Sequence, residues 1–134
     1  MRHNVTFRSS FPLDQSAHPV GEELAKYIYS KLSEQNFVLS DFDNYGDFAW
    51  SANVSIEGSK PWILTGYVGD DDYEWLLQIN TGVGFFKKLF GKSDEDKRNR
   101  IAEAVDGLLK NEQHFSVIRW HLGDFSQGDY SDKP

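Results

Sequence analysis

The chain has 134 residues, and its 14 Lys and Arg against 21 Asp and Glu give a formal net charge of −7. With 39% hydrophobic and 15% aromatic residues it is too apolar for a disordered chain, and its length predicts one domain with its own core. The acidic balance argues against nucleic-acid binding, and the absence of cysteine excludes disulfides, thiol nucleophiles and cysteine-ligated metals.

The predicted elements begin with a short strand over residues 4–10, where apolar and polar residues alternate. A helix is expected over about residues 19–35, because Leu24, Ile28 and Leu32 recur at helical spacing. Four strands separated by regular turn clusters then predict antiparallel hairpins. These four strands are expected at residues 37–43, 48–56, 62–68 and 73–81.

The last third of the sequence predicts an irregular segment over residues 82–92, and then a second helix capped by Ser93 and three acidic residues. A final strand is expected over residues 114–122. A single domain over residues 1–125 and a polar tail over residues 126–134 follow from this pattern. The order β-α-β-β-β-β-α-β predicts an α+β fold: a mainly antiparallel sheet of about six strands with both helices on one face.

No motif in the sequence specifies a chemistry. The glycines at residues 84–93 have the wrong spacing for a phosphate loop, and residues 41–52 lack two ligands of a calcium loop. The histidines show no metal-ligand spacing, and no nucleophile elbow is present. We therefore expect a non-enzymatic protein with no catalytic residue, no metal and no cofactor, although the many Asp and Glu pairs leave a carboxylate dyad open.

The sequence also lacks targeting features. The N-terminus has no apolar signal region, and no run approaches the length of a membrane span. The phenylalanines and lysines of residues 85–92 form too short an amphipathic segment for stable attachment, so membrane contact is not expected. These observations predict a soluble cytoplasmic protein.

Negative charge is concentrated in one part of the sequence. Residues 34–85 hold nine acidic residues and one base, Lys60, so that this stretch carries a charge of −8 and the rest +1. Alternate turns of an antiparallel meander lie at the same end of a sheet, which should bring the turns at 44–46 and 69–72 together. The resulting acidic rim, with the aromatic residues Trp50, Tyr67, Tyr73 and Trp75 beside it, is the expected site of partner binding. Its members are Asp41, Asp43, Tyr45, Asp47, Asp70, Asp71, Asp72 and Glu74.

Two interpretations of this rim stay open. The acids can simply solubilise the protein and protect its strand edges, or they can steer a basic protein partner onto aromatic anchors. Two further alternatives are a small-molecule-binding domain or small enzyme, with a pocket at the boundary of sheet and helices, and a homodimer through the open face of the sheet.

The helix start Gly-Glu-Glu-Leu-Ala at residues 21–25 and the acidic turn and aromatic strand at residues 43–50 carry a resemblance. Together with the order of elements, they resemble small uncharacterised bacterial α+β proteins. Some of these are similar to immunity proteins that neutralise the toxins of neighbouring cells. The resemblance implies an inhibitor or immunity-type role in binding a protein, and it implies no catalytic residue.

Overall fold

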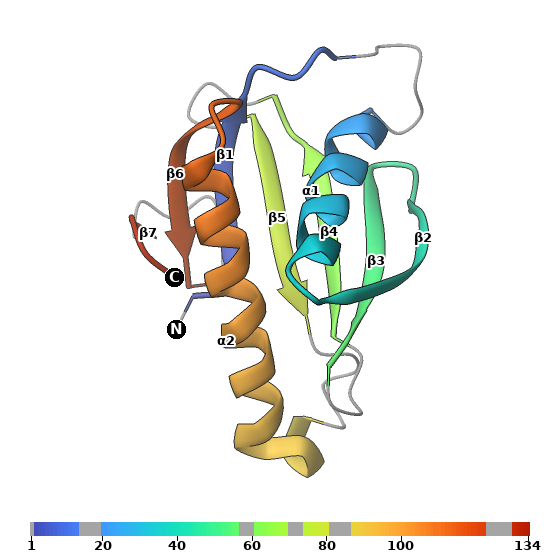
Figure 1. Ribbon diagram of the computed structural model, residues 1–134, viewed down its shortest axis with the longest axis vertical. Helices are drawn as coiled ribbons and strands as arrows, with labels where there is room; N and C mark the ends of the chain where they lie inside the picture. The colour runs from blue at the N-terminus through green and yellow to red at the C-terminus, as the bar shows by residue number, and fades with distance from the viewer. Residues whose placement is uncertain (1, 14–19, 57–60, 70–73, 81–86, 123–129) are drawn as a thin grey trace.

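A seven-stranded antiparallel sheet with the order β2-β3-β4-β5-β1-β6-β7 carries the fold (Figure 1). This computed structural model describes residues 2–13, 20–56, 61–69, 74–80, 87–122 and 130–134, without the side chains of residues 87–94. The elements are β1 (Asn4–Ser9), α1 (Glu22–Glu34), β2 (Val38–Tyr45), β3 (Ala49–Ser55), β4 (Trp62–Tyr67), β5 (Trp75–Asn80), α2 (Lys87–Asn111), β6 (Phe115–His121) and β7 (Tyr130–Ser131).

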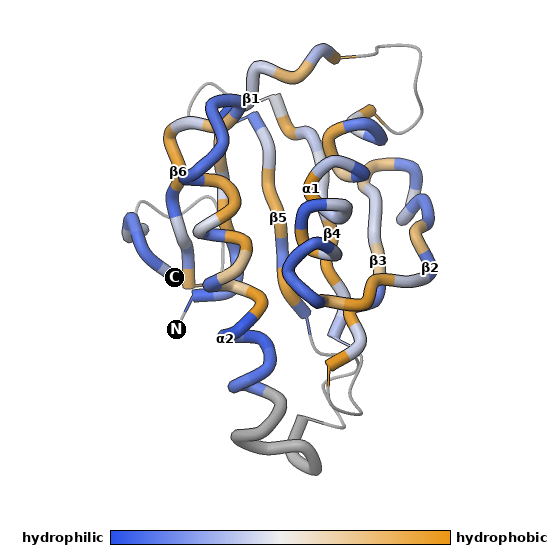
Figure 2. Tube along the Cα trace, in the orientation of Figure 1, coloured by the Kyte–Doolittle hydropathy of each residue, from blue (hydrophilic) through white to orange (hydrophobic). Residues whose placement is uncertain are grey.

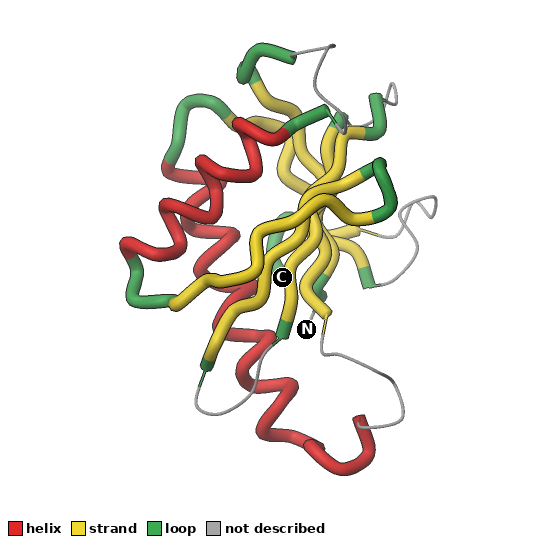
Figure 3. Tube along the Cα trace, turned by 90° about the vertical axis from the view of Figure 1, so that its right-hand side faces the viewer, coloured by secondary structure: helices red, strands yellow, loops and turns green. Residues whose placement is uncertain are grey.

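Both helices cover the same face of the sheet (Figure 3), and the core lies between the two layers. Along α1 and α2, hydrophobic residues alternate with hydrophilic ones (Figure 2), as expected of helices with one buried side. Beneath them, alternate residues of β5 turn toward the helices: Trp75, Leu77 and Ile79 are at most 2% exposed. The α+β class and the antiparallel sheet are therefore as predicted.

The four strands from β2 to β5 form the predicted meander. Tyr45 pairs with Ala49, which pairs with Gly66, while Tyr67 pairs with Trp75. The turn from β2 to β3 consequently lies at the same end of the sheet as the end of β4 and the start of β5. Strands are spaced about 4.8 Å apart, so the turn lies close to these two strand ends.

The sheet has one strand more than the six that the sequence predicts. The additional strand, β7, pairs with β6 through Trp120 and Ser131 and through His121 and Tyr130. It falls within residues 126–134, the stretch predicted as a polar tail. A two-residue strand is too short to show alternation of apolar and polar residues, so the sequence pattern could not reveal it.

The starts of both helices differ from the prediction. The first helix begins at Glu22, because Gly21 adopts a left-handed φ of 103° that ends helical geometry there. The second begins at Lys87, six residues before the expected cap at Ser93. Lys87, Lys88, Leu89 and Lys92 favour a helix despite Gly91, and adding turns to an existing helix is easier than nucleating one. Neither helix, in the part of the chain that the structure describes, is long and apolar enough to span a membrane.

Candidate functional site

The edge strand β2 and the turn after it hold four of the eight predicted site residues. Asp41, Asp43, Tyr45 and Asp47 are all exposed there. Asp70, Asp71 and Asp72 lie outside the described residues. The structure therefore presents part of the predicted acidic rim on a single hairpin.

Glu74 differs from the other predicted site residues, because it is half-buried. Its Oε1 accepts a hydrogen bond from the backbone N–H of Ser9 at 3.2 Å. This bond joins the end of β1 to the connection between β4 and β5. We therefore assign Glu74 a structural role at this end of the sheet.

A β-bulge interrupts the edge strand at Asp41. The register of β2 against β3 shifts between Ser40 and Asp43, and Asp41 has a left-handed φ of 55°. The Asp41 carboxylate accepts a hydrogen bond from the Asn53 side chain on β3 at 2.8 Å, which holds the bulge in place. A bulge twists an edge strand and breaks its ladder, so this edge is a poor template for another strand.

The turn that follows β2 is fixed by its own side chains. The Asn44 side-chain amide donates to Asp47 Oδ1 at 2.9 Å, and the Asp47 backbone N–H donates to Asn44 Oδ1 at 2.9 Å. Asp43 Oδ1 accepts from the Asn44 backbone N–H at 2.7 Å. The two carboxylates are thereby held in set positions at the tip of the hairpin.

Exposed aromatic side chains lie beside these carboxylates. The Tyr45 ring stacks on Trp62, with ring centroids 5.4 Å apart, and meets Phe48 edge-on at 5.6 Å. Tyr45 is 44% exposed and Phe48 is 59% exposed. Val68, which follows β4 at the same end of the sheet, is also exposed. The end of the sheet thus combines apolar surface with negative charge.

The sequence selected different aromatic residues for this rim. Trp50 stacks on Phe42 at 5.0 Å, and Trp75 is 2% exposed and belongs to the core beneath the helices. Tyr67 meets Trp75 at 5.1 Å and is likewise partly buried. The fourth residue of that set, Tyr73, lies outside the described residues.

Phe48 was missed because the alternation of apolar residues assigned it to the same face as Trp50. The strand begins one residue later, at Ala49, and leaves Phe48 in the turn. Asn44, Gly46 and Asp47 are typical turn residues, and their cluster is the signal that could have placed Phe48 there.

Two histidines are structural. His3 Nε2 lies 2.7 Å from Asn99 Oδ1 of α2, and His121 Nε2 lies 2.8 Å from Thr6 Oγ1. Burial lowers the pKa of both imidazoles. Among the residues that the structure describes, no group of three His, Asp or Glu side chains is placed to hold a metal ion.

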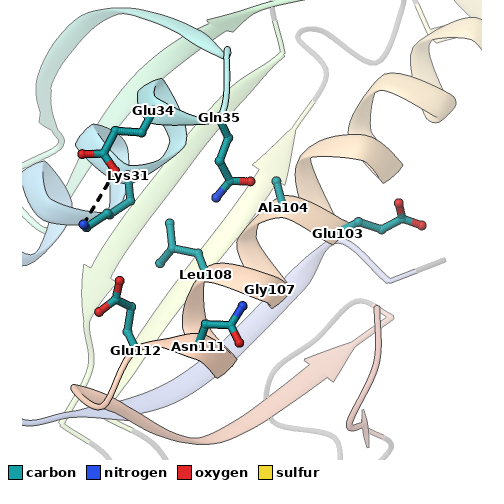
Figure 4. Close-up of a pocket in the computed structure, with 9 residues that line it drawn as sticks. All are labelled: Lys31, Glu34, Gln35, Glu103, Ala104, Gly107, Leu108, Asn111 and Glu112. Carbon is teal, nitrogen blue, oxygen red and sulfur yellow. Dashed lines mark ion pairs between the residues drawn. The ribbon is translucent and has the colours of Figure 1, made fainter.

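A second candidate site lies on the helical side of the molecule. It is a groove of about 370 Å³ between the end of α1 and the last turns of α2 (Figure 4). Charged and amide side chains of both helices form its rim, and Leu108 lies at its centre. No sequence motif pointed to this groove, because its lining comes from two helices far apart in the chain.

Comparison with known proteins identifies no relative. No family model matches the chain, and neither a curated protein nor a solved structure matches it.

Proposed function

We propose that the protein is a non-enzymatic interaction module of the inhibitor or immunity type, which binds a basic protein partner through the β2–β3 hairpin. The observation that carries this proposal is the exposed pair Tyr45 and Phe48 beside the carboxylates of Asp43 and Asp47. Exposed apolar clusters rimmed by polar residues mark protein-binding surfaces. Aromatic residues commonly dominate the energy of such interfaces, and charges steer the partner and fix its orientation.

The hairpin is preorganised for this role. The Tyr45 ring is supported by Trp62, and the turn is closed by the paired bonds between Asn44 and Asp47. A surface that is ordered before binding loses less conformational entropy in the complex. An arginine of the partner suits it well, because guanidinium groups stack on aromatic faces and bind carboxylates in a bidentate manner.

The bulge at Asp41 favours contact through side chains over addition of a strand to β2. The proposed partner therefore rests on the tip of the hairpin. In this proposal the protein works in the cytoplasm, which is consistent with a chain that contains no cysteine.

A second copy of the chain is the alternative partner, through the sheet face that the helices leave open. Ser51, Asn53 and Gln78 lie on that face, and so do Trp62 and Leu64, which are their partners on β4. Leu64 is 4% exposed, whereas Tyr45 and Phe48 of the hairpin are 44% and 59% exposed. We favour the hairpin because its apolar side chains are accessible to a partner.

The test is a quantitative capture experiment with the immobilised protein in an extract of the source organism. One variant combines Tyr45→Ser with Phe48→Ser, and another combines Asp43→Asn with Asp47→Asn. Asparagine can still accept the hydrogen bonds of the turn, so the second variant removes charge and retains geometry. A basic protein retained by the wild type should bind either variant about tenfold or more weakly.

The matched control is Glu22→Gln with Lys26→Gln, which removes an exposed ion pair of 2.9 Å on α1. This variant should capture the same protein as the wild type. Equal capture by the wild type and by both hairpin variants, with no dependence on salt, would refute the proposal.

A further inference from the structure

We propose that the groove between α1 and α2 binds a linear alkyl polyamine. This inference concerns a different surface and a different class of ligand from the hairpin and its protein partner. It rests on three properties of the groove: its size, the chemistry of its rim and the open space at a glycine in its floor.

The groove lies where the two helices run side by side in opposite directions (Figure 1). The last turn of α1 forms one wall, with Lys31, Glu34 and Gln35. Its volume of about 370 Å³ falls in the range of small-molecule sites and leaves room for an extended chain of modest length.

The rim of the groove is rich in hydrogen-bond acceptors. It carries the carboxylates of Glu34, Glu103 and Glu112 and the side-chain amides of Gln35 and Asn111. Among the described lining residues the one cation is Lys31, which is already paired with Glu34 at a distance of 3.6 Å. The final turns of both helices also line the groove, and helix C-termini carry partial negative charge. The matching ligand is a positively charged hydrogen-bond donor, such as an ammonium group.

Another residue of α1, Tyr27, sets the position of Glu112. A hydrogen bond with the Glu112 carboxylate is the main reason why the pKa of Tyr27 lies above its ordinary value. This bond connects the middle of α1 to the residue that follows α2, and it fixes the carboxylate at one side of the groove.

The floor of the groove is apolar. Ala104, Gly107 and Leu108 form it, and Leu108 is 4% exposed. Methylene groups pack well on such a floor, whereas a bare metal ion would need converging oxygen ligands. An alkyl chain that carries amines satisfies both the floor and the rim.

Gly107 adds free space at the floor of the groove. A Cβ built at this residue would meet no atom within 4 Å, so the packing of the chain does not require a glycine there. Glycine nonetheless weakens a helix interior. The residue leaves the α2 backbone open at the floor of the groove, where a ligand chain could approach closely.

Isothermal titration calorimetry with spermidine tests the proposal on the intact protein. Spermidine should bind at one site, and 1,8-octanediol, a linear chain of similar length without charge, should not bind. Gly107→Leu fills the floor and should weaken spermidine binding at least tenfold, and Glu103→Gln should weaken it severalfold. Glu103 is exposed, so Glu103→Gln keeps the test valid if Gly107→Leu disturbs folding.

The paired substitution Asp43→Asn with Asp47→Asn controls for attraction to any acidic surface. It should leave spermidine affinity unchanged. Retained affinity in Gly107→Leu or Glu103→Gln, loss of affinity in the hairpin variant, or equal binding of the diol would each overturn the proposal. None of these results bears on the capture of a protein by the hairpin, which the separate pull-down measures.

Discussion

The Tyr45 ring stacks on Trp62 with centroids 5.4 Å apart and planes inclined by 27°. Tyr45 lies on the edge strand β2, whereas Trp62 begins β4, so the stack reaches across β3. A surface tyrosine that would otherwise sample several rotamers is thereby held in one orientation. The stack links the stability of the sheet to the shape of the proposed binding surface.

Trp62→Ala tests both roles of the stack. Loss of the stack should lower the free energy of unfolding by about 1–2 kcal/mol, since aromatic pairs contribute roughly 0.5–1.5 kcal/mol beyond their buried area. Partner affinity should fall as well, because Tyr45 loses its support. Urea denaturation and titration of the captured partner measure the two effects. Unchanged affinity in a folded Trp62→Ala protein would show that the orientation of Tyr45 does not matter.

Gly21→Ala should destabilise the protein by about 1–3 kcal/mol, the usual cost of a strained backbone conformation. Gly21 has a left-handed φ of 103°, and an added Cβ would come within 2.5 Å of the Trp75 ring. The ring belongs to the core, so it has little freedom to move away. Thermal and urea denaturation provide the measurement, and a stability equal to that of the wild type would contradict this account of the helix start.

Gly107→Ala is the matched substitution in open space. The added Cβ meets nothing within 4 Å, and the residue lies inside α2. The free energy of unfolding should rise by about 0.8–1 kcal/mol, the difference in helix propensity between the two residues. The same denaturation assay compares it with Gly21→Ala, and destabilisation by Gly107→Ala would mean that the groove has less free space than the structure shows.

Tyr29 makes stability depend on pH at the alkaline end. Its hydroxyl donates to the Trp50 carbonyl oxygen at 3.0 Å and lies 2.9 Å from Thr65 Oγ1. Burial raises the pKa of this phenol well above its ordinary value. The unfolded chain therefore releases the proton more readily, so the stability that Tyr29 contributes is present below about pH 10 and is lost as the pH rises beyond it.

Tyr29→Phe tests this dependence. The substitution should cost about 1–2 kcal/mol at pH 7, because the two hydrogen bonds disappear. It should also reduce the loss of stability between about pH 10 and pH 11, since phenylalanine has no proton to release. Urea midpoints at pH 7, 9, 10 and 11 provide the comparison. Parallel pH profiles for the two proteins would show that other groups cause the alkaline loss.

The sequence predicted the sheet and its meander because these depend on local patterns. Alternation and regular turn clusters define hairpins, and the spacing of Leu24, Ile28 and Leu32 defines the buried side of α1. The start of α2 was missed, since the cap signal at Ser93 is strong whereas the preceding residues carry no signal of their own. The short strand β7 was missed because it depends on pairing with a distant segment, β6.

The candidate site was harder to predict than the fold. The acidic residues of β2 were identified from charge alone, but the bulge at Asp41 changes the register of the edge strand, and one residue of shift moves side chains to the other face. The assignment of Phe48 and Trp50 to one common surface failed because β3 begins at Ala49 and leaves Phe48 in the turn. The groove forms where the segment of α1 around Lys31 meets the segment of α2 around Leu108. No local sequence pattern reports such a tertiary contact.

The two edge strands determine whether the folded protein aggregates at high concentration. The bulged, acidic strand β2 borders one side of the sheet, and the two-residue strand β7 borders the other in the described part of the chain. Growth of a sheet from molecule to molecule needs a long, regular and uncharged edge, and like charges on two β2 strands repel each other. Concentrated solutions of the folded protein should therefore stay free of cross-β fibrils. The strand that presents the proposed partner surface, β2, thus also opposes aggregation.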